Sequence, residues 1–345
     1  MSSDGMQEEM FEHFRLVVDP GQAPVRVDSY MSSHLEDTSR SRIQNAIKAG
    51  YVRIGGEPVK ANLIVRPGDV ITFEMPYRPR GREIIAQDIP LDIVYEDGDL
   101  MIVNKPAGMV VHPGHGNFEG TLVNALAHYL GIENPDAGED GHGGILVHRI
   151  DKDTSGLLVV AKNDATQLKL QKQFFKHDIE RLYNAIVWGD PKEDEGTVES
   201  YIGRDPSDRL RFRNFDDPDK GKHAVTHWRV IERFGYVTLV ECRLETGRTH
   251  QIRVHMASLG HPLFNDERYG GSEIRKGTIY AKYQQFIRNC FQICPRQALH
   301  ARTLGFRHPS TGEWIRFDSE LPEDMTALLE KWRKYAGNMP AEQED

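Results

Sequence analysis

Cysteine is scarce in this chain, which has 345 residues and three cysteines, Cys242, Cys290 and Cys294. An odd and sparse set argues against a disulfide framework. Cys290 and Cys294 lie four residues apart with no second pair of soft ligands nearby, so they do not predict a zinc site. Four histidines cluster in sequence without the ligand spacing of a helix: His112, His115, His142 and His148. The sequence therefore predicts no metal.

Long apolar runs are also missing. No stretch approaches the length of about 20 residues that spans a bilayer. The N-terminus, Met1-Ser2-Ser3-Asp4, lacks the basic start and apolar segment of a secretion signal. We therefore expect a cytoplasmic protein without a membrane partner, and the length predicts two domains.

Positive charge is in deficit overall, since the net charge is −9, but the deficit lies at the ends. Residues 1–22 contribute −4 and residues 336–345 contribute −3, which leaves −2 for the rest. Both ends, residues 1–23 and 336–345, read as acidic flexible tails. A nearly neutral body can still carry a basic face.

Residues 24–76 form the first predicted structured unit, a small α+β module. A short helix begins near Val27, and a second helix after Ser39 ends at Gly50. Strands follow at residues 51–54 and 70–73. Six basic residues and one acid, Glu57, lie between residues 40 and 66: Arg40, Arg42, Lys48, Arg53, Lys60 and Arg66. Such a density favours phosphate contacts over a solvated helix face, which normally mixes both signs.

This first unit resembles the S4 RNA-binding domain. The matching segments are residues 39–44, 49–56 and 65–71. The resemblance implies that Arg40, Arg42 and Arg53 contact RNA. Residues 77–89, with three arginines and a proline among them, read as a basic linker.

Residues 90–330 read as one large α+β domain rich in strands. Short apolar runs at residues 100–103, 109–111, 145–147 and 157–161 predict buried strands. Asn163 caps a predicted helix that ends near His177, and strands follow at residues 182–188, 224–234 and 236–244. The small residues 154–156 predict a turn.

A charged segment lies between two of these apolar runs, with Arg149 and Asp151 at the lip of a core strand. In a purely structural interpretation, Asp151 accepts hydrogen bonds from loop amides and Arg149 pairs with Asp153 on the surface. Such a surface ion pair stabilises the fold by no more than about 1 kcal/mol. A later block offers another partner. Ile252, Met256 and Leu259 follow helical spacing and face inward, which puts Arg253 at the edge of a core, where it requires a carboxylate. Arg253 paired with Asp151 would hold a charged nucleophile.

The motifs around these residues resemble the RluA/RluD family of pseudouridine synthases, most of all its ribosomal large-subunit synthase D group. The matching segments are residues 148–158, 246–255, 260–263, 299–301 and 306–309. Ile150 stands where leucine is usual, and Asn265 where glycine is more frequent. The resemblance implies a catalytic domain with a central, largely antiparallel mixed sheet, preceded by the S4-like unit.

The resemblance also implies roles for single residues. Asp151 would be the catalytic aspartate, Arg253 its partner and Tyr183 the tyrosine that stacks on the base. Arg149 would replace the flipped uridine, and Leu299 would contact the base. His148 and Lys105 would lie at the RNA-facing cleft.

The implied activity is the isomerisation of uridine in large-subunit ribosomal RNA, without a cofactor, by a monomer. A synthase for transfer RNA is the alternative within the same class. A non-catalytic ribosome-assembly factor would be favoured if Asp151, Tyr183 or Arg253 were missing, and a nucleoside hydrolase would need a second carboxylate. Whether Asp151 attacks the sugar or the ring, and which group removes the proton on carbon 5, stays open, with Tyr183 a candidate for the latter.

Overall fold

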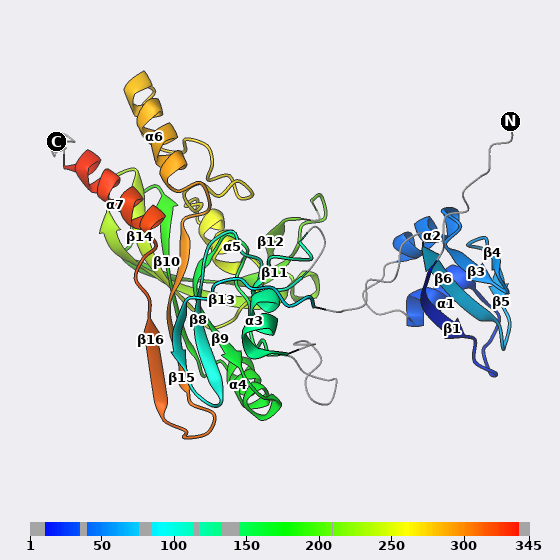
Figure 1. The fold of residues 1–345 in the computed structure, drawn as a ribbon. Coiled ribbons are helices and arrows are strands. Elements are labelled where there is room, and N and C mark those ends of the chain that lie inside the picture. The colour runs from blue at the N-terminus through cyan, green and yellow to red at the C-terminus, as the bar shows by residue number, and fades with distance from the viewer. Residues whose placement is uncertain are drawn as a thin grey trace, which may run out of the picture. The chain divides into compact units, whose positions relative to one another are not determined.

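The chain divides into two compact units, Met1–Glu83 and Ile84–Asp345 (Figure 1). The computed structural model describes residues 11–34, 40–75, 84–113, 117–132, 145–208 and 210–337. The side chains of Arg42 and the residues Ser39, His115 and His142, all named in the sequence predictions, lie outside this description, as do residues 1–10, 77–83 and 338–345 of the predicted tails and linker.

The first unit packs two helices on a small antiparallel sheet. Its helices are α1 (Val27–His34) and α2 (Arg40–Lys48). The sheet has the order β1-β6-β3-β4, with bounds Phe11–Val17, Val70–Met75, Val52–Ile54 and Glu57–Pro58. A separate ribbon pairs β2 (Val25–Arg26) with β5 (Ile64–Val65). The predicted α+β module is therefore present.

The predicted N-terminal tail is too long. Residues 11–17 form β1, which pairs along its length with β6, and Val18 is fully buried in the core of the first unit. Phe14, Leu16 and Val18 follow a period of two that predicts a strand, but the acids of the N-terminal segment led to its interpretation as a tail. The first unit therefore includes residue 11 onward.

The second unit is built on a ten-stranded mixed sheet with the order β12-β11-β13-β14-β10-β15-β9-β8-β7, with β16 attached to β15. The first strands along the chain are β7 (Ile93–Glu96), β8 (Leu100–Lys105), β9 (Ser155–Ala161), β10 (Glu180–Trp188) and β11 (Glu195–Arg204). The later strands are β12 (Phe212–Phe215), β13 (Lys222–Arg233), β14 (Val237–Leu244), β15 (Leu299–Arg307) and β16 (Trp314–Asp318). The prediction of an α+β fold with a largely antiparallel mixed sheet is confirmed.

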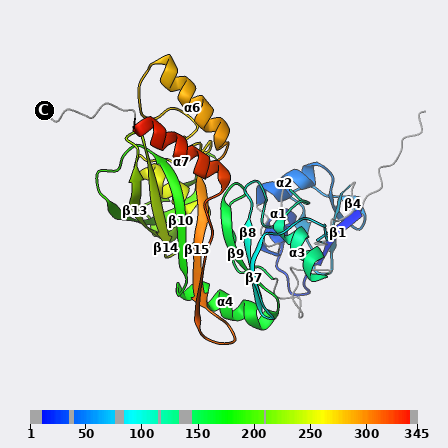
Figure 2. The same ribbon diagram turned by 60° about the vertical axis from the view of Figure 1, so that its left-hand side comes forward.

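Helices cover different parts of this sheet. They are α3 (Leu122–Leu130), α4 (Asp164–Lys176), α5 (Gln251–Ser258), α6 (Ala281–Ile293) and α7 (Glu323–Ala336), with a short 3-10 turn, η1, at Pro218–Lys220. Figures 1 and 2 show α6 and α7 together at one end of the long strands and α4 at the other. Because α7 runs to Ala336, the predicted domain end at residue 330 cuts through a helix.

One pair of strands in the sheet is parallel. β9 pairs with β15 through His300 with Ser155 and Ala301 with Gly156. Gly156 has a φ of 116°, and a Cβ there would lie 2.2 Å from the carbonyl oxygen of Ala301. Only glycine permits this approach. It brings the start of β9, and with it the preceding loop, beside the start of β15.

Four local predictions were wrong. Residues 109–111 and 145–147 form no strand: the carbonyls of Val110 and Val111 accept the first amides of α3, and Leu146 makes only a single bridge to Val160. The turn lies at residues 151–154, where the Thr154 amide donates to the Asp151 carbonyl, and not at 154–156. Leu259 is 40% exposed beyond the end of α5, although Ile252 and Met256 face inward as predicted.

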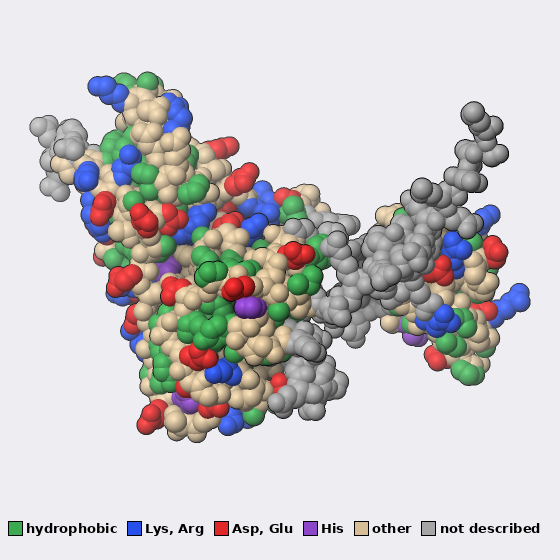
Figure 3. All heavy atoms as spheres, viewed as in Figure 1, with side chains coloured by type: hydrophobic (Ala, Val, Ile, Leu, Met, Phe, Trp, Pro, Cys, Tyr) green, Lys and Arg blue, Asp and Glu red, His purple; other side chains and the backbone are tan. Residues whose placement is uncertain are grey.

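Charges of both signs are interspersed on the face of the second unit that Figure 3 shows. A strong positive field is therefore not a property of this face as a whole. Among the described residues, no helix has the length and apolarity needed to cross a membrane.

Candidate active site

Asp151 lies where two pockets of the second unit meet. Asp151, Arg149, Ile150, His250 and Arg253 line both pockets, which have volumes of about 490 and 740 Å³. Pockets of about 300–1,000 Å³ are typical of ligand sites. The Asp151 side chain is 18% exposed, so its carboxylate is accessible from these pockets.

Two buried basic side chains, Lys105 and Arg296, donate hydrogen bonds to the loop that carries Asp151. Lys105 Nζ donates to the Lys152 carbonyl at 2.9 Å and to the carbonyls of Pro106 and Met109 at 2.8 Å each. Arg296 Nη1 donates to the Asp153 carbonyl at 2.9 Å. Burial lowers the pKa of Lys105 to about 7. These contacts fix the backbone on the C-terminal side of Asp151.

Arg253, on α5, contacts two carboxylates at once. Its Nη1 donates to Asp151 Oδ2 at 2.9 Å, and its Nε and Nη2 donate to Asp266 Oδ2 and Oδ1 at 2.7 and 2.9 Å. Burial acts to lower the pKa of Arg253, but the hydrogen bonds to Asp266 and the charges of both carboxylates raise it. The expected pair of Asp151 and Arg253 is present, and Asp266 is a third member that the sequence prediction missed.

Asp266 is fully buried and orients Arg253. It also accepts the amides of Arg268 and Tyr269 at 3.1 and 3.2 Å. The preceding Asn265 has a φ of 58°, the left-handed conformation that glycine favours and asparagine tolerates. Asn265 can therefore adopt the loop conformation although glycine is more frequent at this position in the family that the sequence resembles. The sequence offered one signal for this contact, since Asp266 follows the α5 segment that carries the inward-placed Arg253.

One oxygen of Asp151 has no hydrogen-bond partner in the part of the chain that the structure describes. Oδ2 faces Arg253 Nη1 at 2.9 Å and His250 Nε2 at 3.9 Å, whereas Oδ1 accepts no hydrogen bond from the described residues. Burial lowers the pKa of His250 to about 4, so this imidazole is neutral at pH 7. The arrangement leaves Oδ1 available for attack on a bound molecule.

Tyr183 and Leu299 line the first pocket beside Asp151. Tyr183 lies on the central strand β10, paired with Cys242 and Ala301, and Leu299 is the first residue of β15. Burial raises the pKa of Tyr183, with the charge of Arg181 opposing and that of Asp151 adding to the effect. The phenol is therefore protonated at neutral pH, which makes it a poor proton acceptor in the free protein.

The two residues that precede Ile150 differ in environment. Arg149 is exposed and lines both pockets. His148 lines the first pocket, but its Nε2 accepts the Val159 amide at 3.0 Å and its ring stacks on Phe174 at a centroid distance of 4.6 Å. Burial lowers the pKa of His148 to about 3. His148 is therefore a neutral packing residue at pH 7, and Arg149 carries the charge.

The structure brings most of the predicted site residues together around one pocket: His148, Arg149, Asp151, Tyr183, Arg253 and Leu299. The prediction of an RNA contact for Lys105 is wrong, because its side chain is fully buried and its Nζ is occupied by three carbonyls.

In the first unit, two of the predicted RNA contacts, Arg40 and Arg53, have partners within the chain. Arg40 pairs with buried Asp28 at 3.2 Å, and Arg53 pairs with Glu74 at 3.3 Å. Lys48, Lys60 and Arg66 are exposed.

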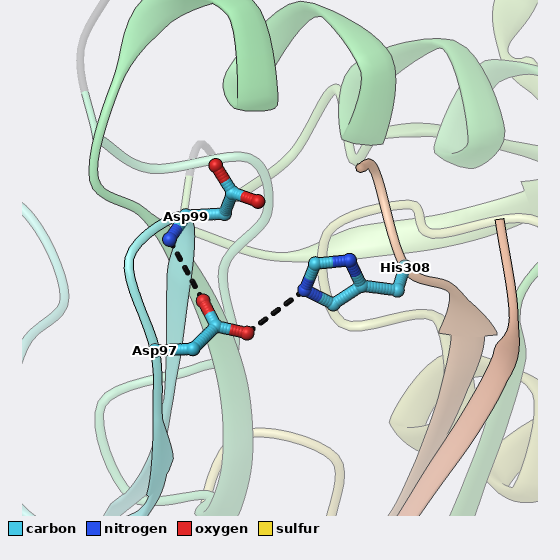
Figure 4. A group of neighbouring side chains, drawn as sticks. All are labelled: Asp97, Asp99 and His308. Carbon is cyan, nitrogen blue, oxygen red and sulfur yellow. Dashed lines mark hydrogen bonds and ion pairs between the residues drawn. The ribbon is translucent and has the colours of Figure 1, made fainter. Parts of the chain in front are cut away.

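A separate group of possible metal ligands lies near the turn between β7 and β8. The ligand atoms of Asp97, Asp99 and His308 lie within 4.8 Å of one another (Figure 4). His308 Nε2 and Asp97 Oδ2 are 2.8 Å apart, and Asp97 Oδ1 accepts the amides of Asp99 and Leu100. Although burial acts to raise it, these amides lower the pKa of Asp97 to about 2. The hydrogen bonds of the turn explain why Asp97, Asp99 and His308 lie close together.

Comparison with known proteins points to one family. The model of the RNA pseudouridylate synthase family matches residues 99–258, and that of the S4 domain matches residues 25–71. An uncharacterized RNA pseudouridine synthase of Chlorobaculum parvum is 46% identical, with 90% of this chain and 95% of the relative covered. A ribosomal large subunit pseudouridine synthase D of Zymomonas mobilis is 45% identical, with 88% and 92% covered.

The fold also has a counterpart among solved structures. The human RNA pseudouridylate synthase domain containing 4 has a TM-score of 0.53 at 24% identity and covers 70% of this chain and 92% of its own. At that identity the likeness concerns the fold alone.

Proposed function

Since this chain belongs to the RNA pseudouridylate synthase family, we propose that it isomerises uridines of large-subunit ribosomal RNA with Asp151 as the nucleophile. The family makes the chain an enzyme that converts uridine in RNA to pseudouridine. Relatives from Zymomonas mobilis and Xanthomonas campestris, 45% and 41% identical, carry the name ribosomal large subunit pseudouridine synthase D. These names and the S4 domain support ribosomal RNA as the substrate.

The reaction needs no redox partner. The bond between C1′ and N1 breaks, the uracil rotates, and C1′ bonds to C5, while C5 loses a proton and N1 gains one. The free Oδ1 of Asp151, with Oδ2 held by Arg253 at 2.9 Å, is the observation that carries the assignment of the nucleophile. A second carboxylate to activate water would indicate a hydrolase, but Asp266 is fully buried with both oxygens engaged.

The remaining pocket residues suit a base that has left its stack, which costs a few kcal/mol. Tyr183 provides an aromatic face, and Leu299 provides an apolar wall. The exposed guanidinium of Arg149 would fill the gap that the flipped uridine leaves. The four arginines that line the pocket favour a polyanion: Arg149, Arg181, Arg248 and Arg253.

Tritium release from ribosomal RNA labelled at uridine C5 tests this proposal. Asp151→Asn should abolish release, whereas Asp153→Asn, two residues along the same loop, should retain it. Equal release by the native protein and Asp151→Asn would refute the assignment of the nucleophile. Mapping of pseudouridine in ribosomal and transfer RNA from cells that lack the gene would identify the substrate, and loss confined to transfer RNA would refute the ribosomal assignment.

A further inference from the structure

Among the described residues of the second unit, three arginine side chains are buried and differ in their partners: Arg181, Arg253 and Arg296. Arg253 is held by Asp266, and Arg296 by Asp324, each through two hydrogen bonds of 2.7–3.0 Å. Arg181 is 7% exposed and has no carboxylate within ion-pair distance among the described residues. It is the exception that requires an explanation.

Arg181 uses only part of its hydrogen-bonding capacity. Its Nη2 donates to the Glu245 carbonyl at 3.0 Å, and its guanidinium lies 5.5 Å from the ring centre of Phe174. Its buried Nε has no hydrogen-bond partner. An unpaired buried cation costs several kcal/mol, which is recovered when a ligand supplies negative charge. Burial correspondingly lowers the pKa of Arg181.

The pocket provides space for this side chain. Arg181 and Gly247 both line the pocket that contains Asp151. A Cβ on Gly247 would lie 2.7 Å from Arg181 Nη1, so the glycine leaves room for the guanidinium. Arg181 and Tyr183 are two residues apart on β10, so both side chains point to the same face of the sheet. The unpaired cation therefore lies beside the surface proposed for the base.

We propose that Arg181 is a further catalytic residue, which donates a hydrogen bond to a carbonyl oxygen of the target uracil and stabilises the negative charge that develops there. The inference rests on the proposed function and deepens it. Exposed Arg149 and half-buried Arg248 are better placed for phosphates, which remain in contact with water.

Charge reaches a uracil oxygen by either route of attack. If Asp151 bonds to C1′, the electron pair of the broken bond between C1′ and N1 enters the ring and is shared by O2 and O4. If Asp151 bonds to C6, the pair of the C5–C6 double bond moves onto O4. A preorganised donor at the oxygen stabilises both species, and removal of one such donor costs about 100- to 1,000-fold in rate.

The experiment measures single-turnover pseudouridine formation with RNA that carries uridine, 2-thiouridine or 4-thiouridine at the target. Arg181→Gln should lower the rate on uridine about 100- to 1,000-fold. Sulfur is a weaker acceptor, so one of the two thio substitutions should slow the native protein more than it slows Arg181→Gln. Arg229→Gln, an exposed arginine paired with Glu241, is the control and should retain the native rate.

The outcomes separate the possibilities. A rate within twofold of native for Arg181→Gln, or equal thio effects in both proteins, overturns the inference. A phosphate contact would instead weaken RNA binding and reduce its salt slope by about 0.7–0.9, with equal thio effects. If Arg181→Gln does not fold, Arg181→Met keeps the length of the side chain without a donor, and a rate within twofold of native for it is equally contradictory. Gly247→Ala should slow the native protein but not Arg181→Gln.

Failure of the proposed function would look different. If the native protein forms no pseudouridine, the proposed function fails and the inference with it. If the native protein is active and Arg181→Gln is equally active, only the inference fails. Tryptophan fluorescence establishes that each variant is folded, because all four tryptophans of the chain lie in the second unit.

Discussion

Replacement of Asp266 by Asn should destabilise the second unit and impair catalysis together. The carboxylate accepts four hydrogen bonds, two from Arg253 and two from the amides of Arg268 and Tyr269. If the Asn oxygen keeps the three bonds made to Oδ1, its amide nitrogen faces Arg253 Nε, which is also a donor. One charge-assisted bond is lost, worth about 1.5–3 kcal/mol, and Arg253 loses a buried counter-charge.

We expect a loss of about 3 kcal/mol in the free energy of unfolding. For a unit of this size, that corresponds to a fall of about 6–12 °C in Tm. Thermal unfolding followed by tryptophan fluorescence reports on the second unit alone, since Trp188, Trp228, Trp314 and Trp332 all lie in it. Because Arg253 also holds Asp151, a displacement of Arg253 by about 1 Å should lower the rate of pseudouridine formation about 100-fold.

The matched control is Glu232→Gln. Glu232 accepts two hydrogen bonds from Arg333 at 2.7 and 2.9 Å, the same geometry as in the pair of Arg253 and Asp266, but both side chains are partly exposed. An exposed pair is worth about 0–1 kcal/mol, so this variant should keep its Tm within a few degrees. Equal effects of the two variants on Tm would refute the role of burial. A destabilised but fully active Asp266→Asn would refute the positioning of Asp151 through Arg253.

Two further predictions concern pH and salt. The buried histidines with a lowered pKa, to about 3 for the first and about 4 for the others, are His148, His250, His255 and His300. In the unfolded chain these histidines bind protons below about pH 6.5, whereas in the folded chain they stay neutral. The free energy of unfolding is therefore highest above this pH and falls toward pH 4, by up to about 1.4 kcal/mol per pH unit for each histidine. A Tm, measured by tryptophan fluorescence, that is constant from pH 7 to pH 5 would contradict this prediction. In the first unit, the combined changes Lys48→Gln, Lys60→Gln and Arg66→Gln should reduce the salt slope of RNA binding by up to about 2, and an unchanged slope would rule out a phosphate-binding role for these exposed residues.

Periodicity and capping residues sufficed for elements whose sequence signals are local. Asn163 caps α4 as predicted, by accepting the Thr166 amide at 2.9 Å, and α4 ends at Lys176. The apolar triplets at residues 109–111 and 145–147 misled because an apolar run indicates burial, whereas a strand also requires a neighbouring strand as the partner of its backbone amides and carbonyls. The carbonyls of Val110 and Val111 instead accept hydrogen bonds from the first amides of α3.

Lys105 shows a second limit. A lysine next to a proline near a cleft was interpreted as an RNA contact, yet it is fully buried. Its three acceptors come from Pro106, Met109 and Lys152, and the last of these lies 47 residues away in the sequence. Backbone carbonyls leave no signature in residue type, so a sequence cannot reveal that a loop will surround an ammonium group.

The requirement that a buried arginine have an anion was the most productive rule in the sequence, and the structure shows how far it reaches. Applied to Arg253, the rule found Asp151 but not Asp266, because it predicts that a partner exists without giving the number of partners. Applied to the folded protein, it is met within the chain for Arg253 and Arg296 and unmet for Arg181. Among the described residues, Arg181 is therefore the buried arginine that folding leaves without a counter-charge, and it lies in the pocket that contains Asp151. A buried arginine without a counter-charge in this pocket can stabilise a negatively charged reaction intermediate, which explains why the rule is not met there.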